Sequence, residues 1–446
     1  MSDTALNPLA VNIEDIRMHK FKGGDEMSLL PQFVELTIYQ SIFEPVIKAE
    51  MLINDNIGLF VNYPLTGEEV ITITYNQNDV STTQNFIIRG IKNVTIGDRA
   101  RSMMFAIELS SVEFLENTRK YVSQAYYGTL DDMAQQVYDE YIAQPTLQNF
   151  GINKPFVPED AGVIRQLVVP NLRPFPALQW LAKHAVALNA EDRFLYLFFE
   201  NLDGFNFVTI QKLIEDGKQQ DSSLDTFIYV ANKEMLDNAQ YQDPQIQSKI
   251  ITNLIYNKRF STVEKVSSGY FQNELFEISL LQKAYKSTPT EIKSGDKLTY
   301  TLHENVVNTP NYIDYVKNPT EGTEYSNRIR YIINNYRDFD SEGSSQPEYR
   351  RKFGKATQNL IAMNQIDLTI TVPANMKIKA GQIVKLKIPE IHGFNDVLDD
   401  PYLTGRFIVN EVKQVIGTSG RAATSMRVYK DSYTQAIEEK TKYKLG

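Results

Sequence analysis

The stretch "FIVNEVKQV" (Phe407–Val415) has a relative, "FIIRGIKNV" (Phe86–Val94), in the first quarter of the chain. Phe, Ile, Lys and Val recur at matching places in the two stretches, and similar aliphatic residues fill two further places. In a chain of 446 residues, two nine-residue windows can match this well by chance. The flanking sequence therefore decides whether the chain contains a duplication.

The upstream flanks agree in kind and in order. "LTGEEVITITY" (Leu65–Tyr75) and "IKAGQIVKLKIP" (Ile378–Pro389) each give a glycine turn followed by alternating apolar residues. Such alternation predicts half-buried β-strands. The strands align best when Ile71 is matched with Val384, one residue away from the offset that aligns the glycines, a difference that a β-bulge or another turn length would absorb.

The downstream flanks agree as well. "TIGDRARSMMFAIELSS" (Thr95–Ser111) and "IGTSGRAATSMRVYKDS" (Ile416–Ser432) each give a glycine-containing turn, an Arg, a Met and an alternating strand. We match Met104 with Met426 in this alignment. Each copy is then a strand, a loop and a β-hairpin, so the sequence predicts two domains of like topology in which Phe86 and Phe407 occupy equivalent positions with the same facing.

Composition excludes several classes of protein. With 446 residues, of which 42% are hydrophobic, the chain is long enough for two to four domains with cores of their own. It lacks both an apolar run of membrane-spanning length and a signal peptide, so we expect a soluble chain. The absence of cysteine excludes disulfides and thiolate chemistry. A formal net charge of −9 argues against a dedicated nucleic-acid binder.

Between the copies the pattern changes to an α+β insertion, which we place at residues 118–268. "TLDDMAQQVYDEYI" (Thr129–Ile142) predicts an amphipathic helix with Thr129 as N-cap, and Arg173–Asn189 predicts a second helix. Arg193–Leu213 predicts a hairpin that turns at "NLDGF". Ser248–Val266 has helical character.

The remaining boundaries follow from the repeat. Residues 1–117 form the first predicted domain. Gly269–Ser287 is predicted to supply the first strand of the second, which comprises residues 269–287 and 355–433. Residues 288–354 show little regular period and are interpreted as an irregular insertion or arm, and residues 434–446 as a C-terminal tail.

No pattern of catalytic or metal-ligating residues emerges. The histidines are scattered, and no HExxH, GxSxG, phosphate-loop or dinucleotide-binding motif is present. The neighbouring carboxylates of two Asp-Asp pairs diverge on a helix or a strand and suit helix-start and turn roles, and Gly417–Ser425 suits a hairpin turn better than a phosphate loop. The sequence therefore predicts no catalytic, cofactor-binding or metal residue, no cofactor and no hydrolytic activity. The residues weighed are His19, His184, His303, His392, Asp131, Asp132, Asp399 and Asp400.

Two other functions stay open at this stage. Aromatic residues make up 11% of the chain and could serve as stacking platforms of a single-stranded nucleic-acid-binding module built from two OB-like barrels. Such a module would need clustered Lys and Arg beside exposed aromatics, whereas these aromatics occur mostly with Leu and Ile in strand-like runs. A tail enzyme such as a peptidoglycan hydrolase would need a carboxylate pair across a cleft, which the insertion does not suggest.

The segment Leu30–Tyr75 resembles the opening of the central baseplate hub protein of contractile-tailed bacteriophages, which is related to the hub part of type VI secretion spikes. Phe198–Phe207 and Ile366–Pro389 are similar to later segments of that family. The resemblance spans most of the chain in the right order, except for the irregular stretch 288–354. The matching residues of the first segment are Ser41, Ile42, Pro45, Leu52, Ile53, Asp55, Pro64, Leu65, Gly67 and Glu69.

This resemblance implies a mainly β, α+β chain with two tail-tube-like antiparallel β-barrels and helix-containing insertions. It implies a homotrimeric symmetry adaptor, in which three chains supply six barrels between a three-fold spike and a six-fold tube. The implied partners are the central spike protein, a tail tube or tube-initiator protein and other baseplate proteins, without stable nucleic-acid binding or membrane insertion. The implied location is the virion's tail baseplate, after assembly in the host cytoplasm, around a DNA channel that an acidic chain would suit.

Overall fold

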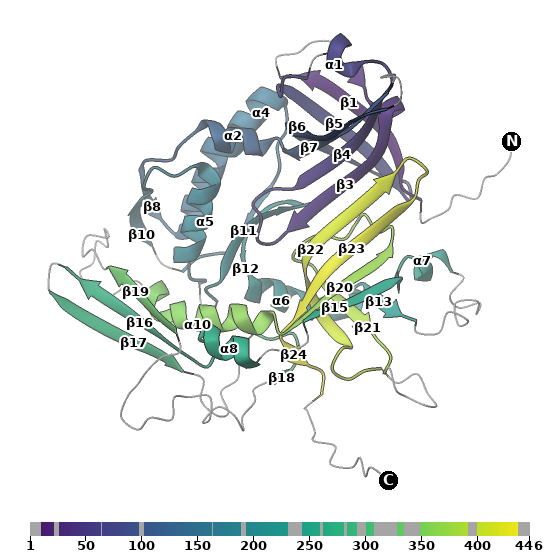
Figure 1. Cartoon of the computed structure of the whole chain (residues 1–446). Coiled ribbons are helices and arrows are strands. Elements are labelled where there is room, and N and C mark those ends of the chain that lie inside the picture. The colour runs from purple at the N-terminus through teal and green to yellow at the C-terminus, as the bar shows by residue number, and fades with distance from the viewer. Residues whose placement is uncertain are drawn as a thin grey trace, which may run out of the picture.

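The computed structural model describes residues 10–21, 26–63, 65–97, 102–162, 164–188, 193–230, 243–258, 262–280, 283–291, 300–306, 328–333, 348–390 and 399–435. Its main feature is a large, mostly antiparallel sheet built from the two ends of the chain, with the helices gathered in the middle of the sequence (Figure 1). The expected mainly β, α+β class is thus confirmed.

The first half of the sheet comes from the N-terminal part of the chain. Its strand order is β2-β1-β5-β6-β7-β4-β3, and all of these pairings are antiparallel. A core of Ile, Leu, Met and Phe side chains packs against it. Its elements are β1 (Asn12–Lys20), β2 (Met27–Ser28), the 3-10 turn Leu30–Gln32, β3 (Phe33–Ser41), β4 (Lys48–Asp55), α1 (Leu59–Asn62), β5 (Glu69–Gln77), β6 (Val80–Ile96) and β7 (Met103–Ser111).

The second half comes mostly from the C-terminal part and has its own core. Its strand order is β15-β20-β23-β22-β21-β13-β14, in which β13 runs parallel to β21 and to β14. Its strands are β13 (Thr226–Tyr229), β14 (Ile250–Ile251), β15 (Asn253–Lys258), β20 (Ile366–Pro373), β21 (Ile383–Lys387), β22 (Gly405–Gly417) and β23 (Ala422–Lys430).

The two halves repeat the same strand order, because β3-β4-β7-β6-β5 matches β15-β20-β23-β22-β21. Phe86 pairs with Ile71 and Phe407 with Val384, which is the offset that the sequence alignment predicts. Three residues further along, both strands carry a β-bulge, at Arg89 in β6 and at Asn410 in β22. Phe86 and Phe407 are buried in separate cores, so their predicted equivalence is confirmed. Among the described pairings, none closes either half into a barrel.

The methionine match of the alignment is wrong. Met426 pairs with Val412 and is fully buried, and the residue in that place of the first half is Ile107, which pairs with Ile91. Met104 lies nearer the hairpin tip and is 41% exposed. The β6-β7 hairpin contains a second bulge, between Lys92 and Thr95, that β22-β23 lacks, so equal distances along the sequence do not give equal positions.

The predicted first strand of the second domain is also wrong. Within Gly269–Ser287, β16 (Gln272–Ser279) lies in a separate three-stranded sheet with β17 (Ala284–Glu291) and β19 (Arg328–Ile333). The strand that pairs with β20 is instead β15, inside the stretch expected to be helical. Among the described residues of that stretch, only those at its end, in α8 (Thr262–Ser268), are helical. The sequence of β15, "NLIYNK", is short and flanked by polar residues, so its strand character is weak without the sheet.

The insertion has the predicted helices and hairpin. Thr129 caps α3 by accepting a hydrogen bond from the Asp132 backbone N–H, and Asn201 pairs with Gly204 across the predicted turn. A third core of aromatic and aliphatic side chains fills it. Its elements are α2 (Glu113–Arg119), β8 (Ala125–Gly128), α3 (Leu130–Tyr138), a π-helical turn (Asp139–Ala143), α4 (Gln144–Phe150), β9 (Phe156–Pro158), β10 (Arg165–Val168), α5 (Pro174–His184), β11 (Tyr196–Asn201), β12 (Gly204–Thr209), α6 (Ile210–Gln219), the 3-10 turn Asp221–Ser223 and α7 (Pro244–Gln247).

The stretch 288–354 contains more regular structure than the sequence suggests. It includes the end of β17, all of β19, the short strand β18 (Asn305–Val306) paired with β24 (Ser432–Tyr433), and the start of α10 (Glu348–Met363). Gly354 of α10 packs against Asn273 and Thr290 of the three-stranded sheet. Residues 292–299, 307–327 and 334–347 of this stretch, and residues 436–446 of the expected tail, lie outside the described residues.

The two halves are joined by strand pairing and by buried side chains. The C-terminal part of β22 pairs antiparallel with β3, which makes one continuous sheet (Figure 1). At the end of β5, the Gln77 Nε2 donates to the carbonyl oxygen of Ala374 at 2.7 Å, and its Oε1 accepts from the N–H of Met376 at 2.8 Å. Ala374 and Met376 are buried in the first core although they precede β21 of the second half. One side chain thus satisfies two buried backbone groups of the other half.

We expect the Gln77→Met variant to be destabilised, because its side chain keeps its length but loses both hydrogen bonds. Each backbone group left unpaired in the interior costs roughly 1–3 kcal/mol. Urea unfolding should show this loss. Gln148 is exposed on α4, so Gln148→Met is a matched control that should change stability by no more than about 0.5 kcal/mol. Equal stability of the two variants would contradict the role assigned to Gln77.

Candidate functional site

The described histidines lie on separate elements and serve structural contacts. His19 is in β1, and His184 at the end of α5 bonds through Nδ1 to the Trp180 carbonyl oxygen at 2.7 Å. The Nε2 of His303 accepts the backbone N–H of Arg406 at 2.8 Å. His392 lies outside the described residues. No cluster of three His, Asp or Glu side chains suited to a metal ion occurs among the residues that the structure describes.

The carboxylate pairs and the glycine-rich loop lie where the sequence places them. Asp131 and Asp132 are in the first turn of α3. Asp400 accepts the backbone N–H groups of Tyr402 and Leu403 in a turn. The loop after Gly417 is the β22-β23 hairpin turn and does not precede a helix, so it is not a phosphate loop.

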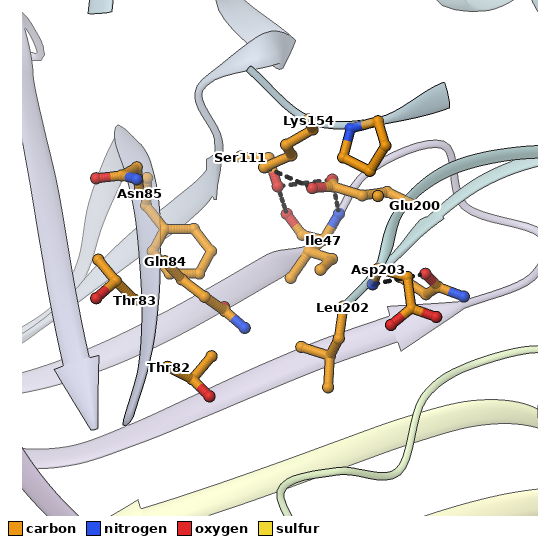
Figure 2. Close-up of a pocket in the computed structure, with 14 residues that line it drawn as sticks. Ile47, Thr82, Thr83, Gln84, Asn85, Ser111, Lys154, Glu200, Leu202 and Asp203 are labelled. Carbon is orange, nitrogen blue, oxygen red and sulfur yellow. Dashed lines mark hydrogen bonds and ion pairs between the residues drawn. The ribbon is translucent and has the colours of Figure 1, made fainter. Parts of the chain in front are cut away.

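A pocket of about 170 Å³ lies where the β11-β12 hairpin of the insertion meets the first half of the sheet (Figure 2). One wall is the β6 segment Thr82–Phe86, and the opposite wall is the hairpin turn Glu200–Gly204. The remaining lining residues are Ile47 directly before β4, Ser111 at the end of β7, and Lys154 and Pro155 before β9.

Glu200 is the centre of the polar contacts in this pocket. Its side chain is fully buried. One carboxylate oxygen accepts the Ile47 backbone N–H and the Ser111 hydroxyl, each at 2.7 Å, and the other lies 2.6 Å from the Lys154 Nζ (Figure 2). Lys154 also donates to the buried Glu113 of α2 at 2.9 Å. One ammonium group therefore lies between two buried carboxylates.

The pKa values of Glu113 and Lys154 are shifted by burial and by the charges that lie close together in this group. Burial raises the pKa of Glu113, and the nearby Glu200 raises it further against the lowering effect of Lys154. Burial lowers the pKa of Lys154, but the two carboxylates outweigh it and the pKa is raised overall. The lysine is thus held protonated, and Glu113 takes up a proton more readily than an exposed carboxyl group does.

This arrangement is suited to holding two parts of the chain together and is poorly suited to nucleophilic catalysis. The Ser111 hydroxyl donates to a carboxylate that already accepts two other hydrogen bonds, and no imidazole lies within the described contacts of this group. A serine nucleophile needs a base that is free to take its proton. Glu200 instead ties the insertion to the start of β4 and the end of β7.

A second buried polar group lies under the segment 300–306. The Lys430 Nζ donates to the carbonyl oxygens of Tyr402 and Thr404 at 3.0 and 2.7 Å, and burial lowers the pKa of Lys430 to about 7. Burial, with Lys430 and Arg406 nearby, lowers the pKa of His303 to about 3, so the ring stays neutral and acts as an acceptor. His303 thus ties the segment to β22, and Lys430 ties β23 to the turn that contains Tyr402 and Thr404.

The surface best suited to an interaction is formed by two open strand edges. The distal part of β6, from Gly90 to Ile96, pairs with β7 on one side only, whereas its counterpart in β22 pairs with β23 and β3 on both sides. Likewise β15 pairs with β20 alone among the described strands. Large apolar side chains are exposed here, with Val94 at 52%, Ile96 at 62% and Ile255 at 47%. Exposed apolar strand edges are typical pairing sites for another chain.

The fold is mainly β with two strand edges that no described strand pairs with, and the described residues form no cluster of three His, Asp or Glu side chains suited to a metal ion. None of the described helices is long and apolar enough to cross a membrane. No family model matches the chain, and no curated protein matches its sequence.

Several solved structures are similar to this chain along most of its length. A tail protein from Neisseria meningitidis MC58 superposes with a TM-score of 0.51 at 11% identity, over 94% of this chain and 96% of that one. The 43 kDa tail protein of prophage MuSo2 from Shewanella oneidensis gives 0.48 at 11% identity, over 93% and 97%. A component of the E. coli type VI secretion system gives 0.41 at 7% identity, over 94% and 76%. The first of these superpositions, with a TM-score above 0.5, shows that the chain has the fold of the Neisseria tail protein, which confirms the resemblance at the level of fold.

The sequence does not reveal the Glu113–Lys154–Glu200 group. Glu113 and Lys154 are 41 residues apart along the chain, Lys154 and Glu200 are 46 apart, and no motif connects them. The only sequence signal for this group is the position of two acidic residues inside apolar runs, Glu113 in "SSVEFLEN" and Glu200 in "LFFENL". A carboxylate in such a run needs a partner when it is buried.

Proposed function

We propose that this chain is the structural hub of a phage-type tail baseplate. In this role it is a homotrimeric adaptor that joins a three-fold central spike to a six-fold tail tube and lines the DNA channel. Residues 12–117 form the first tube-like unit, and β13–β15 with β20–β23 form the second. Each unit corresponds to one β-barrel of the hub.

The observation that carries this proposal is the repeated strand order within one chain. Two units with the same order lie side by side and share a sheet through β22 and β3. A three-fold assembly of such chains presents six similar units, which reconciles three-fold with six-fold symmetry. The units differ in detail, since β13 is parallel to β21 whereas β1 is antiparallel to β5, so three-fold partners can still distinguish them.

The remaining parts of the proposal agree with the chemistry of the chain. A hub acts through its surfaces, and the buried polar groups described above serve internal contacts. A net charge of −9 suits a channel through which DNA slides without adhering. The partners in this role are the spike, a tube or tube-initiator protein and other baseplate proteins. The protein would reside in the virion tail after assembly in the host cytoplasm.

Copy number in the assembled tail tests the proposal. Quantitative mass measurement of purified tails should give three copies of this chain per tail, and two, four or six copies would contradict it. A filter-binding assay with single-stranded DNA at low salt tests the rival nucleic-acid-binding function, and we expect no retention of DNA. Salt-dependent retention with saturating stoichiometry would favour the rival.

A further inference from the structure

We infer that the open edges of β6 and β15 pair with each other between two copies of this chain, antiparallel, as β22 and β3 pair within one copy. This inference rests on the proposed function for the number of chains in the assembly. The partner surface itself follows from the repeat. The pairing of β22 with β3 inside the chain is the template for the pairing between chains.

The template is the pairing of β22 with β3. Seven residue pairs run from Glu411–Ser41 to Gly417–Glu35. The contact covers both strands, because Thr37 is 7% exposed and Gln414 is fully buried. Lys413 lies opposite Tyr39, with its Nζ 5.8 Å from the centroid of the ring. A well-covered two-strand contact of this kind therefore already exists between the two units of one chain.

The equivalent strands are identified by their shared pairing. β6 is equivalent to β22 through Phe86 and Phe407. β15 is equivalent to β3 because each pairs antiparallel with the matching strand, β20 or β4. Each unit therefore has one strand of the β22 type, β6 or β22, and one strand of the β3 type, β3 or β15. Among the described pairings, only β22 and β3 pair with each other within the chain. The unused pair is the distal part of β6 in one unit and β15 in the other.

The exposed residues on the unused strands agree with this assignment. Thr37 of β3 is 7% exposed, whereas Ile255, at the equivalent place in β15, is 47% exposed. Val94 and Ile96 of β6 are more than half exposed, while Ile416 of β22 is fully buried. Pairing with a second copy would cover these apolar side chains and extend the sheet along two strand edges that no described strand pairs with.

The template also sets the register. Counting along the strands from the equivalent residues places Lys92 opposite Asn257, where the template has Lys413 opposite Tyr39. Each of the two strands has a β-bulge beside this point, after Lys92 in β6 and after Tyr256 in β15. Because a bulge shifts the pairing by one residue, the template gives the register to within one residue. The contact is heterologous, because the first unit of one chain meets the second unit of the next chain. The rotation between neighbouring chains therefore decides whether the assembly closes into a ring.

Disulfide trapping tests the pairing, since the chain has no cysteine of its own. Lys92→Cys is combined in turn with Tyr256→Cys, Asn257→Cys and Lys258→Cys, and the purified full chains are oxidised mildly. We expect one of these pairs to form disulfides between chains, because cysteines on directly opposed strands meet the required Cα separation of about 4.4–6.8 Å. Trapping is cumulative, so even a short-lived contact gives covalent product on non-reducing gels.

Matched variants give the controls. Lys413→Cys with Tyr39→Cys places the same pair on the template and should form a disulfide within one chain. Lys92→Cys with Gln148→Cys places the second cysteine on the exposed face of α4 and should give only background linkage. Unfolding curves of the reduced variants verify that each one is folded.

The outcomes separate this inference from the proposed function. A ladder of linked chains that ends at three supports both. A ladder that ends at another number, or does not end, supports the strand pairing and contradicts the three-chain hub. If the template pair links and none of the three β15 cysteines does, the pairing is overturned, while a separate mass of three chains in the tail would leave the hub proposal standing.

Discussion

Replacing Lys154 with Met should cost about 3–5 kcal/mol of unfolding free energy at neutral pH, the range found when one partner of a buried ion pair is removed. The substitution leaves Glu113 and Glu200, both with fully buried side chains, without the ammonium group between them. Urea unfolding monitored by tryptophan fluorescence reports on the insertion directly, because the single Trp180 lies in α5.

The penalty should depend on pH in a definite direction. Burial raises the pKa of Glu113 in the folded protein, so its contribution to stability is greatest at low pH and is lost as the pH rises through the folded pKa. Without Lys154 this pKa rises further, so the difference between variant and parent should shrink as the pH falls. Adding Glu113→Gln to Lys154→Met should recover part of the loss at neutral pH.

The exposed pair Lys212–Asp216 on α6 provides the control. Both side chains are more than one third exposed, so Lys212→Met should cost less than about 1 kcal/mol at any of these pH values. A Lys154→Met variant that is no less stable than Lys212→Met, or whose penalty grows on acidification, would contradict the assigned role of the buried group.

The second large effect is expected at the repeated phenylalanines. Phe86→Ala and Phe407→Ala should each cost about 3–5 kcal/mol, because each removes a buried ring from a filled core. The rings belong to separate cores, so the double variant should lose about the sum of the two single losses. Chemical denaturation of the four proteins measures this directly.

The matched control is Phe43→Ala, since Phe43 is 43% exposed and should contribute about 1 kcal/mol or less. If only one of the two buried rings mattered, or if the losses were strongly non-additive, the two halves would not be equivalent units with independent cores.

The duplication could be predicted because its signal is local. The pattern around Phe86 and Phe407 fixes strand, turn and hairpin within a few dozen residues, and the offset that matched Ile71 with Val384 is the one that the paired strands have. The capped helix at Thr129 was predictable for the same reason, since cap and apolar stripe lie within one helix.

The errors arise where distant partners decide the structure. β15 is a strand because β20 pairs with it, although β20 lies beyond the whole stretch 288–354. β16 has the stronger alternation, but its partners are β17 and β19, so it does not join the large sheet. Alternation predicts that a segment is a strand, but it does not predict which strands pair with it. The Glu113–Lys154–Glu200 group was missed in the same way, because only the tertiary fold brings its members together.

The most direct measurement is an electron-microscopy reconstruction of the assembled tail around this chain. The account predicts three copies and six similar units around a central channel, with β15 of each chain at strand-pairing distance, about 4.8 Å, from the distal part of β6 of the next. A reconstruction with another copy number, or with three copies whose β6 and β15 edges face different partners, would contradict it.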